Sequence, residues 1–174
     1  YFGGSEDGAM KTNKANITID GDSFNFYFEK SGSNKGAGVT GEKDDKYYLA
    51  GMLVKAGSDE KYQVVKKVKD NNGTVYAYQK LDDADAFLAD LGTANYTTVD
   101  VESLADKTTV SIGYVNKKAE DLKEAYTVNT PSADYFLVNT SGSVVDKKSK
   151  SKDGDDYVFV TAKGGKILGV YVED

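Results

Sequence analysis

The feature of this sequence that most constrains its fold is a series of short aromatic clusters, each followed within a few residues by glycine. Phe2, Phe28 and Tyr48 end three such clusters. The spacing between them, roughly two dozen positions, is typical of stacked β-hairpins, each too small to fold alone and each closed by its neighbours. The segment 1–54 is therefore expected to be an array of hairpins.

Strand and turn signals alternate along the same stretch. Apolar and polar residues alternate over 17–19 and 24–28, and Asp20-Gly21 between them supplies the positive φ angles of a two-residue hairpin turn. The phenylalanines of the second strand then share one face, away from Asn25 and Tyr27. By the same criteria, further strands are predicted over residues 61–69, 74–78, 96–101 and 109–115.

Two helices are predicted among these strands. Residues 82–91 combine acids in the first turn with Gly92 as a C-terminal stop. The apolar residues of this helix at helical spacing are Ala84, Phe87, Leu88 and Leu91. A second helix is predicted over 116–125, with Asn116 as its N-cap, and a short helical turn is expected around 102–105. The apolar face of the second helix would consist of Ala119, Leu122 and Ala125.

The strand pattern returns after Pro131 and matches an earlier part of the chain. Residues 135–137 align with residues 47–49, and the strand-like segments that follow each triplet align as well. We interpret this as one β unit present twice. The expected fold is mainly β with a minor α+β segment, divided into β-hairpin repeats at 1–78, a helix-containing α+β insert at 79–131 and a C-terminal β repeat unit at 132–174.

The residue types of the chain argue against catalysis. It has no cysteine and no histidine, which excludes disulfides and the usual thiolate, histidine and zinc-thiolate sites. A glycosidase needs two carboxylates at a set separation inside a cleft, and nothing singles out a pair among the 28 acidic residues. The serines and lysines of 147–152 lie in a polar run typical of an exposed loop, where lysine stays charged and cannot act as a base. We therefore expect no enzyme and no cofactor.

Three clusters of aspartate are candidate metal sites. Calcium is the ion they would suit, because it is a hard cation that prefers carboxylate oxygens. They lie at residues 20–22, 82–85 and 153–156. None continues into the twelve-residue calcium loop that ends in glutamate. Turn formation and helix N-capping account for all three clusters, so no metal site is predicted.

Charge and hydropathy limit the partners. The formal net charge is −6 and the sequence pI is about 4.8, so no nucleic-acid partner is expected. No apolar run approaches the ~20 residues that span a bilayer, and no signal peptide is recognised. Because the chain starts in mid-motif at Tyr1, we interpret it as a fragment whose export signal lies elsewhere. An open hairpin edge can pair with another strand, which makes self-association through an edge strand a further expectation.

The aromatic and glycine positions of the segment 1–54 form a repeated pattern. One copy contains Tyr1-Phe2, Asp7-Gly8, Met10 and Thr12; a second contains Phe26-Tyr27-Phe28, Gly32, Val39 and Thr40-Gly41; a third begins at Tyr47-Tyr48-Leu49. In this order they resemble the cell-wall-binding repeats of Gram-positive surface proteins, a family that includes choline-binding modules and glucan-binding repeats. The resemblance implies a hairpin scaffold on a secreted protein of the cell surface or cell wall.

The positions at which this family carries its ligand-binding tryptophans are occupied differently here. Lys14, Asn25, Glu42 and Lys46 stand where the resemblance implies tryptophan. In choline-binding members those rings form a cage that holds a quaternary ammonium group by cation–π attraction, so choline binding is not implied for this chain. The remaining candidates for a ligand surface, whose aromatic members also suit packing between hairpins, are Phe26, Phe28, Tyr47, Tyr48, Met10 and Met52.

These observations lead to two hypotheses of function. The first is non-catalytic attachment to a cell-wall polymer or glycan, because tyrosine rings can stack on sugar faces while their hydroxyls stay hydrated. The second is a structural spacer or protein-interaction module without a small ligand. Exposed, coplanar rings along one face favour the first hypothesis, and rings buried between hairpins favour the second.

Overall fold

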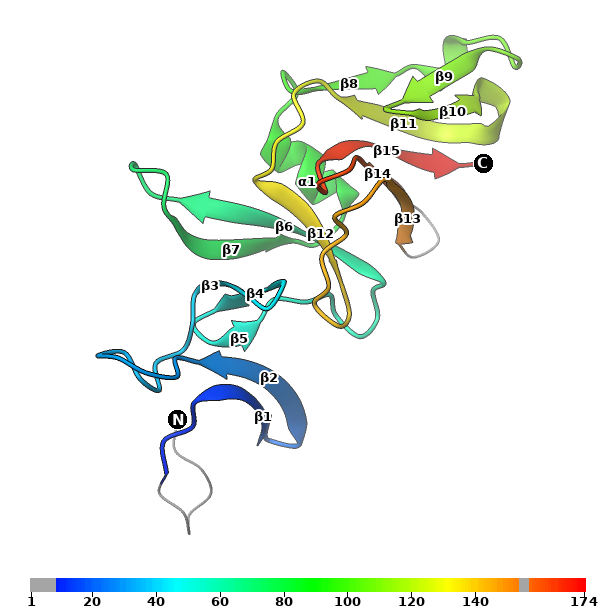
Figure 1. Cartoon of the computed structure of the whole chain (residues 1–174). Helices are drawn as coiled ribbons and strands as arrows, with labels where there is room; N and C mark the ends of the chain where they lie inside the picture. Colours follow the sequence, from blue (N-terminus) through cyan, green and yellow to red (C-terminus); the bar gives the residue numbers. More distant parts are fainter. Residues whose placement is uncertain (1–8, 154–156) are drawn as a thin grey trace. The chain divides into compact units, whose positions relative to one another are not determined.

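The computed structural model describes residues 9–153 and 157–174 (Figure 1). Within these residues the chain is mainly β with a single α-helix, as the sequence predicts. The first aromatic cluster, Tyr1-Phe2, lies outside the described residues, as does the Asp7-Gly8 position. The chain forms two compact units: the first contains residues 1–54 and 67–78, and the second contains residues 55–66 and 79–174.

The first unit contains an antiparallel sheet with the strand order β1-β2-β5-β4-β3. Its strands are β1 (Asn13–Ile19), β2 (Asp22–Phe28), β3 (Gly41–Lys43), β4 (Lys46–Leu49) and β5 (Met52–Leu53). Three of the four connections are two-residue turns, at Asp20-Gly21, Asp44-Asp45 and Ala50-Gly51, and both residues of each turn have φ between 49° and 93°. Positive φ at both central residues is the type I′ geometry that matches strand twist. The hairpin predicted at Asp20-Gly21 is therefore confirmed.

A three-stranded sheet has the order β12-β6-β7. Its strands are β6 (Tyr62–Lys69), β7 (Val75–Leu81) and β12 (Tyr135–Asn139). The loop between β6 and β7 is closed by Asp70, whose Oδ1 accepts the backbone N–H groups of Asn72 and Thr74, both at 2.9 Å. The loop lies between the two strands predicted over 61–69 and 74–78, and both strands are present. Residues 67–78 of the hairpin belong to the first unit and the remainder to the second.

The second unit is built on a sheet with the order β13-β14-β15-β11-β8, accompanied by a separate β9-β10 hairpin. The strands are β8 (Tyr96–Val99), β9 (Thr109–Ile112), β10 (Val115–Lys118), β11 (Leu122–Val128), β13 (Ser149–Asp153), β14 (Tyr157–Thr161) and β15 (Ile167–Glu173). Both faces of β14 and β15 are covered by apolar side chains. Phe159 and Val170 belong to one buried cluster, and Val160 and Tyr171 belong to another. Because both faces of these strands are buried, their sequences are nearly continuous apolar runs.

The helix α1 (Ala84–Leu91) belongs to the cluster that contains Phe159. Asp83 is its N-cap, with Oδ1 accepting the N–H of Ala86 at 2.7 Å, and Gly92 ends it with φ of 84°. All four apolar residues named from the helical spacing are buried. The helix is confirmed, and its short length means that packing, rather than intrinsic propensity, holds it in place.

The predicted helix over 116–125 is wrong. This stretch contains the end of β10, a 3₁₀ turn η2 (Ala119–Asp121) and the start of β11. A register shift between Leu122 and Glu124 interrupts the two-residue alternation of β11. Leu122 and Ala125 can therefore both be buried although they lie three residues apart, a spacing that imitates a helix. Asn116 accepts a hydrogen bond from Ser111 Oγ across the β9-β10 hairpin at 2.7 Å and caps no helix.

The strands of the predicted middle segment and C-terminal unit share one sheet. β11 pairs with β15, so strand pairing crosses the expected boundary at residue 131. β12 pairs with β6, whereas β14, which aligns with β6 in sequence, pairs with β13 and β15. The two copies of the inferred repeat are thus not built as equivalent sheets. The helical turn expected at 102–105 is present as η1 (Val101–Ser103).

Two hydrogen bonds from tyrosine hydroxyls to aspartate carboxylates also attach α1 to the rest of the second unit. The hydroxyl of Tyr135 donates to Asp90 Oδ2 at 2.6 Å, and the hydroxyl of Tyr157 donates to Asp85 Oδ1 at 3.1 Å. Lys66 Nζ lies 2.8 Å from the same Asp90 oxygen. Burial raises the pKa of the Asp90 carboxyl, but the hydrogen bonds from Lys66 and Tyr135 outweigh it, and the net pKa lies below its ordinary value.

Asp90→Asn is expected to lower the free energy of unfolding by about 1–2 kcal/mol at pH 7, because a charge-assisted pair is lost. The folded-state pKa of Asp90 is lower than its unfolded value, so the pair stabilises fully above the ordinary carboxyl pKa. This contribution disappears as pH falls through the lowered pKa. Urea denaturation at pH 7 and at about pH 2.5 tests this: the difference from wild type should shrink in acid. A pH-independent difference, or an equal effect of the exposed control Glu102→Gln, would contradict the assignment.

Candidate functional site

Two of the candidate aromatic residues form a stacked pair on the first unit. Phe26 and Phe28 project from the same side of β2, because side chains two residues apart in a strand share a face. Their rings lie 5.7 Å apart with only 7° between their planes. Phe28 is buried and Phe26 is half-buried. Met52 is the cross-strand partner of Phe26 and is 46% exposed, so the pair and Met52 form a partly open apolar surface, which we call the Phe26 platform.

Tyr48 lies on the opposite side of this sheet. Leu53 follows Met52 on β5 and so faces away from it, and Tyr48 is the cross-strand partner of Leu53. Tyr48 is only 3% exposed, and its ring meets the Tyr27 ring at 5.4 Å and 63°. Burial raises the pKa of the Tyr48 phenol. Tyr48 therefore serves the core of the first unit and offers no ligand surface.

Tyr47 is half-buried among other side chains of the first unit. Its ring lies 5.1 Å from the ring of Tyr78, at 52°, and Lys67 Nζ lies 5.1 Å from its centroid. Burial, followed by the neighbouring Tyr47 and Glu42, raises the pKa of Tyr78 to about 12. The ring of Tyr47 is thus engaged by an aromatic neighbour and a cation, which leaves little of it for a ligand.

Met10 precedes β1 and is 45% exposed. Its side chain lies so close to Gly36 that a Cβ at that glycine would collide with it. Among the described residues, every large apolar side chain that is exposed belongs to the first unit; these are Met10, Ile19, Met52 and Tyr76. Within residues 9–153 and 157–174, the exposed large apolar side chains thus belong to the unit that carries the sequence candidates.

The positions that replace the family tryptophans are occupied by polar interactions. Lys14 Nζ lies 2.7 Å from Asp44 Oδ2, and both side chains are exposed. The amide of Asn16 donates to Asn25 Oδ1 across the β1-β2 hairpin at 3.0 Å. The hydrogen bond and charge of Asp44 raise the pKa of Lys14, so the lysine stays protonated within this ion pair at neutral pH. Lys14 offers no aromatic face on which choline could stack.

A second candidate surface is an acidic hollow of about 390 Å³ in the second unit. Two of the aspartate clusters singled out in the sequence, 82–85 and the one that begins at Asp153, come together here with a third acidic segment. The residues that line it are Asp59, Glu60, Asp82, Asp83, Asp85, Asp153 and Tyr157. Sequence reasoning missed this hollow because the three segments are distant in the chain and no local motif links them.

Several of these carboxylates have structural partners. Asp83 caps α1, and Asp85 accepts the hydroxyl of Tyr157, whose pKa is raised by burial and then by this bond. Asp153 Oδ1 accepts the N–H groups of Lys61 and Tyr62 at 3.1 and 3.2 Å. Across residues 9–153 and 157–174, no three acidic side chains are arranged to hold a metal ion. Asp83 caps a helix and Asp20 adopts the positive φ of a turn, which are the two structural roles predicted for these clusters.

A smaller hollow of about 230 Å³ lies along β8, η1 and β11. Its lining includes Val99, Val101 and Ala125, together with Glu124, which accepts a hydrogen bond from the Tyr126 hydroxyl at 3.0 Å. Burial, followed by this bond, raises the pKa of Tyr126 to about 12. Tyr126 is therefore a neutral hydrogen-bond donor at physiological pH and no general base.

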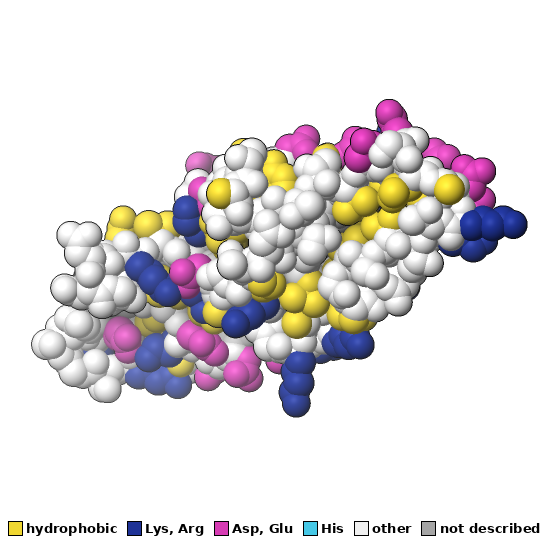
Figure 2. Space-filling view, turned by 90° about the horizontal axis from the view of Figure 1, so that it is seen from above, with side chains coloured by type: hydrophobic (Ala, Val, Ile, Leu, Met, Phe, Trp, Pro, Cys, Tyr) yellow, Lys and Arg dark blue, Asp and Glu magenta, His cyan; other side chains and the backbone are white. Residues whose placement is uncertain are grey.

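Charged side chains of both signs are mixed over the surface. On the face that Figure 2 shows, lysine and acidic side chains lie close together, and apolar groups are exposed between them. Among the described residues, no helix combines the length and apolar character needed to cross a membrane. Comparison with protein-family models, with curated protein sequences and with solved structures gives no match.

Proposed function

We propose that this chain is a non-catalytic binding module of a secreted bacterial surface protein, and that the Phe26 platform holds a glycan of the cell envelope. The observation that carries the proposal is the parallel stacking of Phe26 on Phe28 beside the exposed side chain of Met52. Flat apolar surfaces of this kind match the C–H faces of sugar rings. The resemblance of the segment 1–54 to cell-wall-binding repeats supports the envelope location.

Polar groups that a sugar requires are available beside the platform. Asn13 is the cross-strand partner of Phe28 and is exposed, so an amide is available at the end of the β1-β2 hairpin that carries Phe28. A few convergent polar groups around an apolar surface are the usual composition of a small-ligand site. The platform thus combines a stacking surface with a hydrogen-bond donor and acceptor.

A spacer or protein-interaction module without a small ligand is the second candidate. The burial of Tyr48 and Phe28 favours it, because these rings pack within the first unit and leave Phe26 as the single half-open ring of the pair. The two candidates differ in one measurable property, retention on an envelope polymer.

Phe26→Ala is expected to reduce retention of the full chain on insoluble peptidoglycan or β-glucan roughly tenfold, because one stacking surface is lost. The measurement is the fraction bound in a pull-down at low salt, with urea denaturation to show that the variant is folded. Tyr76→Ala removes an exposed aromatic ring from the same unit and should leave retention unchanged. If the wild-type chain is not retained on either polymer, the glycan proposal is wrong and the spacer hypothesis takes its place.

A further inference from the structure

The second unit carries a concentration of lysine on one edge strand. Four of the six residues from 147 to 152 are lysine, in a chain whose net charge is −6. β13, which contains the last part of this run, lies at the edge of the sheet, next to β14 (Figure 1). Because β13 has no second neighbour among the described residues, the outer side of this strand is open to a partner.

The lysines of this run alternate with serines. Lys150 and Lys152 are the cross-strand partners of Val160 and Val158, and Ser151 is the partner of Phe159. Ser151 is 1% exposed, whereas the lysines on either side of it are exposed. Side chains two residues apart on a strand share a face at a spacing of about 7 Å. Lys150 and Lys152 therefore project from the same face of β13. Lys148 lies in the bend just before this strand, and we call the three residues Lys148, Lys150 and Lys152 the lysine row.

One lysine of the row is held by an aromatic ring. Lys148 Nζ lies 3.9 Å from the centroid of the Tyr114 ring, which fixes one end of the row. No ion pair of the three lysines is found within the described residues. Glu173 is paired with Lys117 at 2.6 Å; this hydrogen bond is the main cause that lowers its pKa, and the charges of Lys152 and Lys150 add to it.

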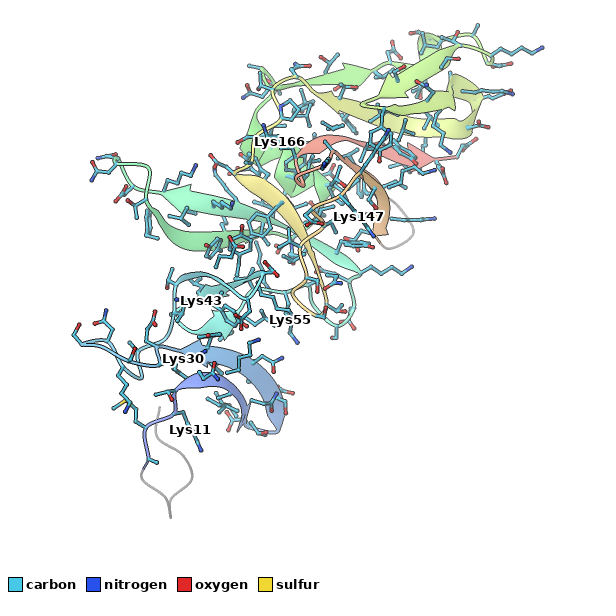
Figure 3. All side chains as sticks on the ribbon, viewed as in Figure 1. Lys11, Lys30, Lys43, Lys55, Lys147 and Lys166 are labelled. Atoms are coloured by element: carbon cyan, nitrogen blue, oxygen red, sulfur yellow. The ribbon has the colours of Figure 1, made fainter. Side chains whose placement is uncertain are left out.

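Further lysines lie at the start of β13. The N–H of Gly164 donates to the carbonyl of Asp146 at 2.7 Å, which brings the β14-β15 turn against the segment that leads into β13. Lys163 and Lys147 are the chain neighbours of these two residues, and both are exposed. Lys147 and Lys166 are labelled in Figure 3. Lys147 and Lys163 thus lie near the start of the lysine row, together with the acidic residue Asp146.

We propose that the lysine row binds a linear polyol-phosphate chain, an anionic polymer with one phosphodiester per repeat. Point charges that follow one another along an edge segment, two of them about 7 Å apart on one strand face, match a single extended polyanion better than a duplex or a compact anion. Lysine acts as a point charge suited to phosphate, whereas paired recognition of carboxylates relies on arginine, which this chain lacks. The proposal concerns a different unit and a different ligand chemistry from the Phe26 platform and does not depend on it.

Two alternative roles of the lysine row make different predictions. Single-stranded nucleic acid binds through exposed aromatic rings on which bases stack, but the ring beside the row, Tyr114, carries the ammonium group of Lys148. Lysines on an edge strand also prevent edge-to-edge pairing of sheets. In that case their removal would cause association of the protein without changing its affinity for a polyanion.

The test is the binding of poly(glycerol phosphate) to the full chain, measured by calorimetry at several salt concentrations. Lys148→Gln/Lys150→Gln/Lys152→Gln should lower affinity roughly 10- to 100-fold at low salt. The matched control, Lys35→Gln/Lys80→Gln/Lys107→Gln, changes the net charge equally at exposed positions and should retain wild-type affinity. Wild-type affinity should fall with salt, with a log–log slope of roughly −2 for three contacts, a readout that needs no variant.

The proposal is wrong if the wild-type chain does not bind poly(glycerol phosphate), or if the two triple variants lose affinity equally. It is also wrong if oligo-dT binds as tightly, because that would indicate a nucleic-acid surface. Unchanged affinity together with dimerisation of the row variant would contradict it too, because the lysines would then only protect the edge. Phe26→Ala should leave poly(glycerol phosphate) binding intact. Failure of the glycan pull-down can therefore be distinguished from failure of this inference.

Discussion

Phe87→Ala is expected to lower the free energy of unfolding by about 3–5 kcal/mol, the usual cost of removing a buried phenylalanine from a core. Phe87 is 1% exposed. Its ring meets Tyr135 edge-on at 5.3 Å and Phe159 at 6.4 Å, which joins α1 to β12 and β14. Because α1 is too short to be stable alone, a cavity under its centre should loosen the whole helix and with it the Asp90–Tyr135 bond.

Far-UV circular dichroism during urea denaturation measures this effect. Ala89→Ser alters the same helix at an exposed position and is the matched control, expected to change stability by less than about 0.5 kcal/mol. Phe87→Leu keeps most of the volume and should fall between the two. A loss below about 1 kcal/mol for Phe87→Ala would mean that the ring does not form the centre of this core.

The elements that sequence reasoning predicted well are those whose signals are local. α1 has its cap, its apolar spacing and its stop within one short segment, and the β1-β2 hairpin has alternation on both sides of Asp20-Gly21. The turn at Asp44-Asp45 was missed because aspartate adopts positive φ far less often than glycine, although its short polar side chain tolerates it.

The false helix at 116–125 has a different origin. A bulge in β11 and a 3₁₀ turn before it shift the alternation so that buried residues recur every three positions. Sequence periodicity alone cannot distinguish this from an amphipathic helix, because the shift is set by the pairing of β11 with β15. The paired strand, Ile167–Glu173, is distant from this stretch in the sequence.

The candidate surface was predicted in part. Period-two spacing correctly placed Phe26 and Phe28 on one face, but it could not separate the buried Tyr48 from the exposed Met52. Their environments depend on β5, a two-residue strand whose pairing with β2 decides which side each neighbour faces. The lysines of 147–152 are evident in the sequence, where the polar run predicts an exposed loop. Serine and lysine have weak strand propensity, and residues 149–152 are extended because they pair with β14.

Gly169→Val is expected to be at least as damaging as the loss of Phe87, through overpacking rather than a cavity. Gly169 lies within β15 between Thr127 on β11 and Val160 on β14. A Cβ added there would lie 2.5 Å from the backbone oxygen of Tyr126, and it would also collide with the side chain of Ile112. The oxygen cannot retreat without opening the β11-β15 ladder, so either the ladder or the β9-β10 hairpin must shift.

Gly169→Ala already requires this shift and should cost about 1–3 kcal/mol, and the two further methyl groups of valine add to it. Gly57→Ala is the matched control, because a Cβ there would meet Glu60 at 3.6 Å, an ordinary contact, and stability should stay within about 0.5 kcal/mol of wild type. Urea denaturation gives the free energies, and hydrogen exchange of β11 and β15 amides locates the disturbance. Full protection of those amides in folded Gly169→Val would contradict the close approach of Ile112 and β11 to this glycine, since a side chain could then be added without moving either of them.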